Sequence, residues 1–194
     1  MGFEIARRIG KTWEDAQELH RTILDFPFQT TGKSESDFEK GFATSLMFNR
    51  RKYNRNVITQ IDKETAVQSV YCFGKKHRPD MTLDENGIAI EMKFVTYDGL
   101  RNAIGQGYLY RLRYKFVFLI LVVGEKRRHV YEGIANGKEK DLEDTLQHLA
   151  DNMNIFSYIV PSFKLKPPVK KALSFVPDVL EGAPVSIAVG TMTK

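Results

Sequence analysis

The spacing of apolar residues along the chain predicts a mixture of helices and strands. Phe38, Phe42 and Leu46 recur every four residues, which is the spacing of one buried helix face over residues 36–48. The eight consecutive apolar residues 116–123 predict a strand buried on both faces. Further predicted elements are helices over 12–24 and 138–152 and strands within 57–73 and over 155–160. An α/β fold is therefore expected.

A β-hairpin is predicted in the middle of the chain. Residues 81–83 and 88–94 have the composition of strands, and the link between them ends in Asn-Gly, the sequence that favours a tight type I′ turn. Because side chains alternate along a strand, Glu91 and Lys93 should share one face of the second strand. The apolar residues beside them should share the other face.

This hairpin carries residues suited to phosphodiester cleavage. Pro79 cannot donate to a strand ladder, so it fits the start of the first strand, and pairing across the hairpin brings Asp80 toward Glu91. Mg²⁺ is commonly held by one or two carboxylates together with water and substrate phosphate. We therefore expect Asp80 and Glu91 to bind a divalent metal, with the backbone carbonyl of Met92 as a further oxygen ligand. Lys93 would position or deprotonate the attacking water and offset charge on the phosphate.

These residues, Pro-Asp followed by Glu-x-Lys, resemble the PD-(D/E)XK nuclease superfamily, and the resemblance covers roughly residues 34–123. It implies a restriction-endonuclease-like core with αβββαβ order, in which a mixed sheet of four to five strands is flanked by helices. It also implies metal binding by Asp80 and Glu91, a catalytic Lys93, and hydrolysis of DNA with Mg²⁺ or Mn²⁺.

A second motif lies downstream. Gln106 and Tyr110 form Gln-x-x-x-Tyr, which looks like a motif of the RecB-like branch of that superfamily, and their i, i+4 spacing places them on one helix face. The resemblance directs Gln106 toward the lysine or the substrate and Tyr110 toward the nucleic-acid backbone. A separate apolar stripe is expected to pack on the sheet; its members are Leu100, Ile104, Tyr108 and Leu112.

Glu39 lies on the apolar side of the helix predicted over 36–48. A carboxylate there needs a partner, and the resemblance offers the metal site as that partner. The alternative is structural, because Ser36 and Glu39 have the spacing of an N-terminal capping box. Glu35 is a second candidate for the acidic position.

Charge gives further candidates for nucleic-acid binding. The net charge of the 194-residue chain is only +5, but basic residues cluster before Asp80 and along the Gln106 helix. The residues expected to contact phosphates, besides Tyr110, are Lys75, Lys76, Arg78, Arg101, Arg111 and Arg113.

The organisation predicted for the chain is an N-terminal helical arm (1–33), a nuclease-like core (34–160) and an extended, proline-containing tail (161–194). No membrane-spanning segment and no nucleotide-binding P-loop are predicted. One cysteine, Cys72, excludes an internal disulfide and favours a cytoplasmic location. DNA is the expected partner, and a homo-oligomer is left open. The alternatives are a junction resolvase, a RecB-like exonuclease, or a non-cleaving nucleic-acid-binding or assembly protein with the same fold.

Overall fold

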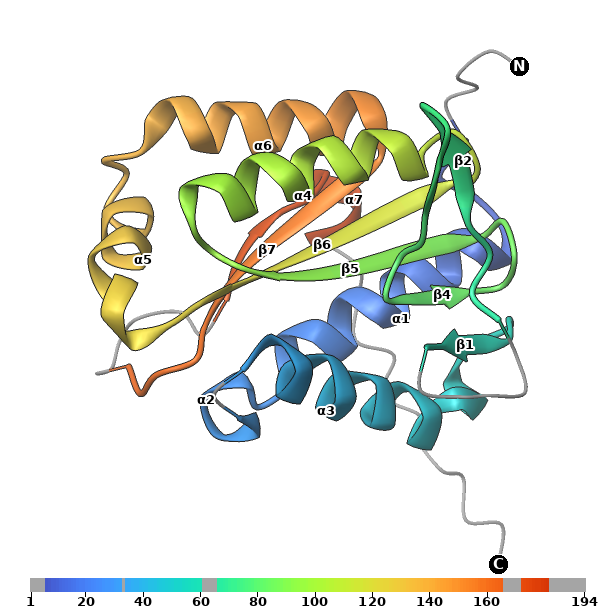
Figure 1. The fold of residues 1–194 in the computed structure, drawn as a ribbon, viewed down its shortest axis with the longest axis horizontal. Helices are drawn as coiled ribbons and strands as arrows, with labels where there is room; N and C mark the ends of the chain where they lie inside the picture. The colour runs from blue at the N-terminus through green and yellow to red at the C-terminus, as the bar shows by residue number, and fades with distance from the viewer. Residues whose placement is uncertain (1–5, 33, 61–65, 166–171, 182–194) are drawn as a thin grey trace, which may run out of the picture.

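A mixed β-sheet lies between two layers of helices in the computed structural model, which describes residues 6–32, 34–60, 66–165 and 172–181 (Figure 1). The helices are α1 (Lys11–Asp25), α2 (Phe28–Thr31), α3 (Glu35–Phe48), α4 (Tyr97–Tyr110), α5 (Arg128–Ala135), α6 (Lys140–Met153) and α7 (Asp178–Glu181), with 3-10 turns η1 (Arg50–Lys52) and η2 (Glu125–Arg127). The strands are β1 (Val57–Thr59), β2 (Val70–Cys72), β3 (Lys75–His77), β4 (Met81–Leu83), β5 (Ile88–Phe94), β6 (Phe116–Val123), β7 (Ile155–Pro161) and β8 (Leu173–Phe175).

The central sheet of the described chain has six strands in the order β1-β4-β5-β6-β7-β8. Strands β5, β6 and β7 are parallel, and the remaining neighbours are antiparallel. The predicted α/β fold with a mixed sheet flanked by helices is confirmed, but the predicted four to five strands were too few. The additional edge strand, β8, is only three residues long and lies in the proline-containing segment, where local sequence favoured no regular element.

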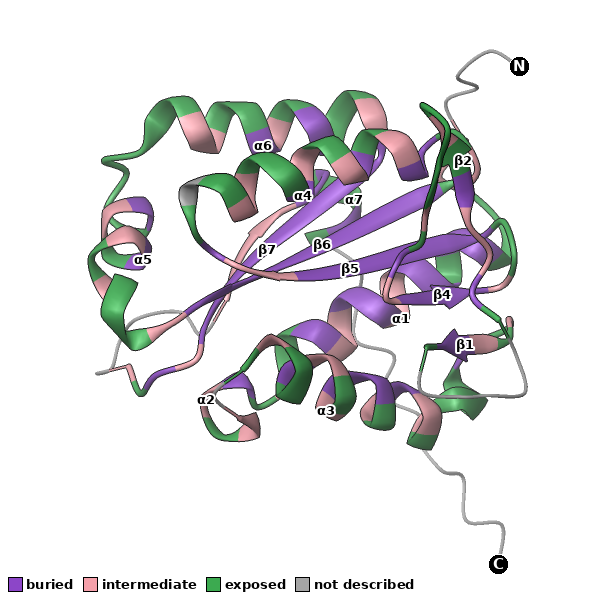
Figure 2. Ribbon diagram, in the orientation of Figure 1, coloured by how far each residue is buried: buried purple, intermediate pink, exposed green. Residues whose placement is uncertain are grey.

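The long strands β5, β6 and β7 are buried along most of their length (Figure 2), and their residues belong to two separate hydrophobic cores. Ile90 and Met92 of β5 belong to the core shared with α1, α2 and α3, whereas Ala89 belongs to the core under α4, α5 and α6. All eight residues of β6 are buried, as expected for a central parallel strand with helices on both sides.

The buried side of α4 differs from the predicted stripe. Tyr108 and Leu112 are 39% and 46% exposed, while Ala103 and Tyr110 are fully buried. A Cβ added to Gly107 would lie 3.2 Å from Ile155 Cγ2, so the absence of a side chain lets α4 approach the sheet closely. Leu100 and Ile104, the other two members of the predicted stripe, are partly buried and pack against the same core as Ala103 and Tyr110.

The β4–β5 connection is not the predicted Asn-Gly turn. Leu83 pairs with Ile88, which leaves a four-residue loop, and the left-handed position is Asp84 with φ 65°. The Asp84 carboxylate pairs with Arg55, and the backbone N–H of Asp84 donates to the Asn56 carbonyl oxygen at 2.8 Å. Tertiary contacts with the segment before β1 therefore decide the turn.

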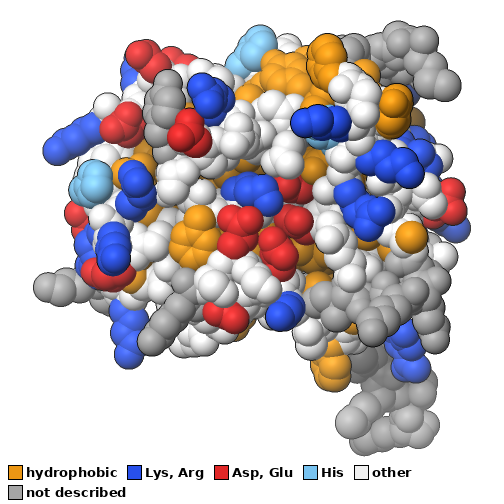
Figure 3. Space-filling view, viewed as in Figure 1, with side chains coloured by type: hydrophobic (Ala, Val, Ile, Leu, Met, Phe, Trp, Pro, Cys, Tyr) orange, Lys and Arg blue, Asp and Glu red, His pale blue; other side chains and the backbone are white. Residues whose placement is uncertain are grey.

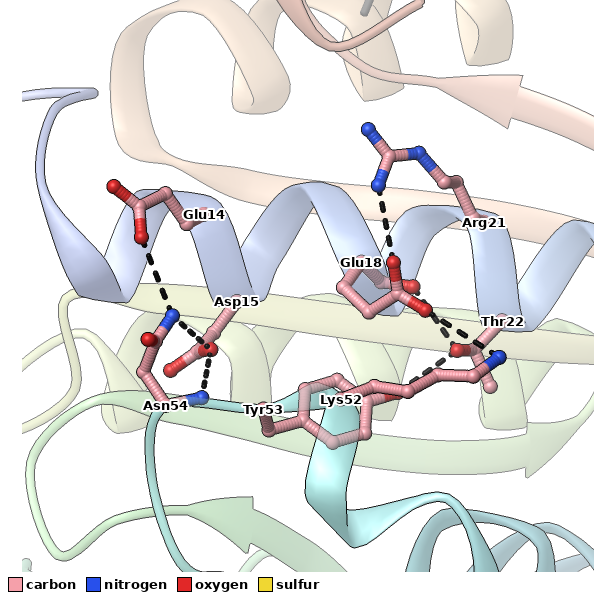
Figure 4. Close-up of polar contacts among 8 residues, drawn as sticks. All are labelled: Glu14, Asp15, Glu18, Arg21, Thr22, Lys52, Tyr53 and Asn54. Carbon is pink, nitrogen blue, oxygen red and sulfur yellow. Dashed lines mark hydrogen bonds and ion pairs between the residues drawn. The ribbon is translucent and has the colours of Figure 1, made fainter. Parts of the chain in front are cut away.

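Helix α1 is fixed to the segment between α3 and β1 by polar contacts (Figure 4). The buried Asp15 carboxylate accepts a 2.7 Å hydrogen bond from the Asn54 N–H, and the hydroxyls of Thr22 and Tyr53 are 2.8 Å apart. Burial raises the pKa of Asp15, an effect that its bonds to Asn54 partly offset. The predicted helix over 12–24 is confirmed, and it packs against the sheet through the Trp13 ring, 5.4 Å from that of Phe116.

Several sequence predictions fall partly outside the described residues. These are the ends of the N-terminal arm (1–5 and 33), part of the strand region (61–65), and much of the tail (166–171 and 182–194). Within the described ranges, no helix has the length and apolar character needed to cross a membrane.

Candidate active site

The β4–β5 hairpin brings Asp80 and Glu91 together. Met81 pairs with Ile90, so the residue before Met81 comes opposite the residue after Ile90. Asp80 Oδ2 accepts a 2.8 Å hydrogen bond from the Met92 N–H, which fixes this carboxylate against β5. The predicted proximity of the two acids is therefore present. The backbone N–H of Met92 contacts Asp80. The sequence had instead predicted a role for the Met92 carbonyl, as a metal ligand.

Lys93 lies among these acids. Its Nζ is 3.1 Å from Glu91 Oε1 and 3.2 Å from Glu35 Oε1. Glu91 is only 2% exposed, and its other oxygen accepts a 3.0 Å hydrogen bond from the Tyr110 hydroxyl. Figure 3 shows acidic side chains gathered around a basic one between β5 and α3. The site is thus built from β5, the residue before β4, and helices on both faces of the sheet.

Helix α3 contributes two carboxylates, Glu35 and Glu39, rather than one. The capping box of α3 is formed by Ser34 and Asp37, so the predicted box of Ser36 and Glu39 is wrong. Glu35 Oε2 instead accepts a 2.9 Å hydrogen bond from the Phe94 N–H while its Oε1 pairs with Lys93. The sequence favoured Glu39 over Glu35 because Glu39 lies on the apolar side of the predicted helix.

Glu39 lies next to Asp80. Both residues line a cavity of about 90 Å³, together with Gln60 and Met81. This volume exceeds the roughly 30 Å³ that one water occupies in the liquid, so the cavity is large enough for an ion or a small number of waters beside the carboxylates. Burial and the neighbouring Asp80 carboxylate raise the pKa of Glu39.

The electrostatics of the site favour an added cation. Burial and the charge of Asp80 raise the pKa of Glu91 to about 7, and burial also raises the pKa of Asp80. Burial would lower the pKa of Lys93, but the charges of Glu91, Asp80 and Glu35 outweigh it, so the pKa is raised. Four carboxylates around one ammonium leave an excess of negative charge in a poorly solvated place.

The carboxylates of this site are oxygen ligands of the kind that Mg²⁺ prefers. Among the residues that the structure describes, no group of three or more His, Cys, Asp or Glu is arranged to hold a metal. Mg²⁺ is commonly held by only one or two protein carboxylates, which the pair Asp80 and Glu91 would supply. The pair, the cavity beside it and the excess negative charge fit such an ion, which would compete with the Lys93 ammonium for Glu91.

Gln106 and Tyr110 occupy different positions relative to the acids. The Tyr110 hydroxyl lies 3.0 Å from both Glu91 Oε2 and the Arg78 carbonyl oxygen, so this buried side chain positions the carboxylate. Gln106 is half-buried, and its Oε1 is buried with no hydrogen-bond partner among the described residues. An acceptor of this kind is available to a ligand or to water.

Some of the basic residues predicted to contact phosphates are exposed, and others already bind protein groups. Lys75, Lys76 and Arg78 are exposed. Arg101 is exposed and pairs with Asp98, and Arg113 donates to the Glu85 carbonyl. Arg111 is only 8% exposed and donates to the backbone carbonyls of Met153 and Tyr114. Its predicted contact with nucleic acid does not fit this placement, because the guanidinium is used to hold the end of α4.

A cleft at the end of β5 was not predicted from the sequence. It has a volume of about 620 Å³ and lies at the ends of β5, β6 and β7, where Phe94 and Phe163 line it together with Lys126, Arg127 and Lys164. The basic residues 126–128, shortly after the buried strand 116–123, were a sequence signal that could have identified this cleft. The carboxyl ends of parallel strands are a common position for ligand sites.

Comparison of the chain with protein-family models, with curated proteins and with solved structures finds no match. The case for a function therefore rests on the residues and their geometry.

Proposed function

We propose that this protein is a nuclease that hydrolyses DNA phosphodiester bonds with Mg²⁺ or Mn²⁺, acting in the cytoplasm. The observation that carries the proposal is the convergence of Asp80, Glu91 and Lys93 within a cluster of excess negative charge. Strands β2 and β3 form a separate two-stranded sheet between β1 and β4. Without this hairpin, the chain order is α3-β1-β4-β5-α4-β6, which supports a restriction-endonuclease-like core because it follows the αβββαβ order implied by the sequence resemblance.

Each residue has a role that follows from its contacts. Asp80 and Glu91 would hold the metal, and Glu39 lines the small cavity beside Asp80. The metal supplies polarisation of a phosphoryl oxygen and a more acidic bound water. Lys93 would direct its N–H groups at the attacking water or a phosphate oxygen and offset the charge that develops there. Tyr110 and Glu35 hold Glu91 and Lys93 in place through their hydrogen bonds.

The route of the DNA backbone follows from the surrounding charge. Lys126, Arg127 and Lys164 line the cleft at the ends of the parallel strands. Lys75, Lys76 and Arg78 are exposed on the chain that leads into Asp80. Basic side chains on both approaches to an acidic site suit a phosphate chain passing across it.

Cleavage assays with defined substrates test the proposal. Supercoiled, linear, single-stranded and branched DNA are incubated with the protein in Mg²⁺, Mn²⁺ or EDTA. We expect cleavage that needs the metal and is lost in Asp80→Asn and Lys93→Met, with binding retained. Glu85→Gln is the matched control, because Glu85 is an exposed carboxylate on the same hairpin.

The same panel separates the alternatives. Selective cutting of branched DNA indicates a junction-resolving enzyme, and release of nucleotides from ends indicates an exonuclease. Binding without cleavage under any metal condition contradicts the nuclease and favours a non-cleaving binding protein. Cleavage that is equal in the wild type and Asp80→Asn points to a contaminating enzyme.

A further inference from the structure

The β2–β3 hairpin presents aromatic side chains to solvent. Phe73 at its tip is 92% exposed and Tyr71 is 71% exposed. Tyr108 of α4, the helix that this hairpin contacts, is 39% exposed. Figure 3 shows hydrophobic and basic side chains side by side at the right of the view, where Figure 1 places the hairpin. Exposed aromatic side chains on one short hairpin are typical of interaction surfaces.

Phe73 occupies a backbone conformation that a bulky side chain rarely adopts. Cys72 pairs with Lys75, so the turn consists of Phe73 and Gly74 alone, with φ values of 51° and 72°. A two-residue turn with both φ values positive favours Asn or Gly at the first position. The requirements of the turn therefore do not explain why a Phe stands at position 73. Strained, exposed residues of this kind often occur at functional sites.

The base of the hairpin is held by hydrogen bonds and by burial of Val70. The Tyr114 hydroxyl donates to the Gln68 carbonyl at 2.7 Å, just before β2, and the Tyr110 hydroxyl contacts the Arg78 carbonyl at 3.0 Å, just after β3. Val70 of β2 is buried in the core beneath α4. The tip therefore projects from a fixed support, and the same Tyr110 connects that support to Glu91.

The position and charge of the hairpin suit DNA. Lys75 and Lys76 are exposed on β3 directly after the tip. Phe73 precedes Asp80 by seven residues, so at about 3.3 Å per residue the tip lies at most about 23 Å from the acids. At 3.4 Å per nucleotide along one strand, this reach corresponds to about seven nucleotides.

We propose that the β2–β3 hairpin is a wedge that inserts Phe73 between bases, with Lys75 and Lys76 on the adjacent phosphates. This rests on the proposed action on DNA and narrows the substrate to duplexes interrupted by a fork, gap or flap. Inserting an apolar side chain requires unstacking of bases, and unstacking costs least where one neighbour is already unpaired. The wedge would hold such a boundary a few nucleotides from Asp80 and Glu91.

Fluorescence of 2-aminopurine at the boundary of a forked oligonucleotide tests the wedge in EDTA, where no cleavage occurs. We expect wild-type protein to raise the fluorescence as the base unstacks. Phe73→Ala should abolish the rise and weaken fork binding by roughly 5- to 150-fold, the range for loss of one base-stacking aromatic. Phe73→Trp should retain both. Phe48→Ala is the matched control, because Phe48 is 89% exposed and also precedes basic residues.

The outcomes distinguish this proposal from the nuclease itself. A fluorescence rise that depends on Phe73, without cleavage in Mg²⁺ or Mn²⁺, supports the wedge and contradicts the nuclease. Metal-dependent cleavage with Phe73→Ala equal to wild type in fork affinity and fluorescence overturns the wedge and leaves the nuclease. A wild-type dimer that becomes monomeric in Phe73→Ala by sedimentation makes the hairpin a subunit contact and also overturns the wedge.

Discussion

Replacing Glu91 by Gln is expected to stabilise the metal-free protein at neutral pH. The carboxylate is 2% exposed, and burial together with Asp80 raises its pKa from the usual 4.5 to about 7. Because the folded state binds the Glu91 proton more tightly than the unfolded state does, the contribution of Glu91 to stability falls as pH rises from 4.5 to about 7 and then stays constant. At roughly 1.4 kcal/mol per pH unit, that interval corresponds to about 3 kcal/mol.

Gln resembles the protonated acid in shape and is never charged. Glu91→Gln should therefore equal the wild type in stability near pH 4.5 and exceed it at pH 8 by about 3 kcal/mol, or about 6–12 °C in Tm for a domain of this size. Urea and thermal unfolding in EDTA across pH 4.5–8 measure both values. Glu85→Gln, which removes an exposed charge from the same hairpin, should leave the wild-type pH dependence unchanged.

Added metal should reduce the stability difference between Glu91→Gln and the wild type by about half. A ligand that binds only the folded state stabilises it by RT ln(1 + [L]/Kd), so 10 mM Mg²⁺ with a Kd of about 1 mM contributes about 1.4 kcal/mol, or about 3–6 °C. The wild type should gain this stabilisation, and Glu91→Gln should lose most of it together with cleavage. A Glu91→Gln protein that is less stable than wild type at pH 8 in EDTA would refute the reasoning. Such a result would mean that the buried, charged carboxylate does not lower the free energy of unfolding.

Three further predictions address other buried groups. Arg111→Met should destabilise the fold by about 2 kcal/mol in urea unfolding, because it leaves two backbone carbonyls without their donor. The DNA affinity of this variant should be unchanged. Weaker DNA binding at unchanged stability would contradict the structural role of Arg111. Burial lowers the pKa of His20, whose Nδ1 lies 2.9 Å from the Tyr158 hydroxyl, so stability should fall as pH drops through 6.5. Unfolding in the Glu91→Gln background measures that slope without the opposing one, and an unchanged slope in His20→Gln would contradict the assignment. Tyr110→Phe should cost about 1 kcal/mol of stability and reduce cleavage by shifting Glu91, and unchanged cleavage would show that the hydroxyl is not needed there.

The sequence by itself determined the features that depend on periodicity and local pairing. The eight apolar residues of β6 required burial on both faces, and the helical spacing of Phe38, Phe42 and Leu46 placed α3. Alternation along β5 put Ile90 and Met92 in one core, while pairing with β4 brought Asp80 to Glu91. These outcomes follow from contacts between residues that are close in the chain.

Only the tertiary structure decided the contacts made by distant residues. Glu35 meets Lys93 because α3 packs across the end of β5, and Arg111 turns inward because the end of α6 presents a carbonyl to it. Asp84 takes the left-handed turn position because the segment before β1 binds its carboxylate and its N–H, which no local preference for Asn-Gly could anticipate. Burial and opposing charges set the pKa of Glu91, and both depend on packing between elements that the sequence does not place relative to one another.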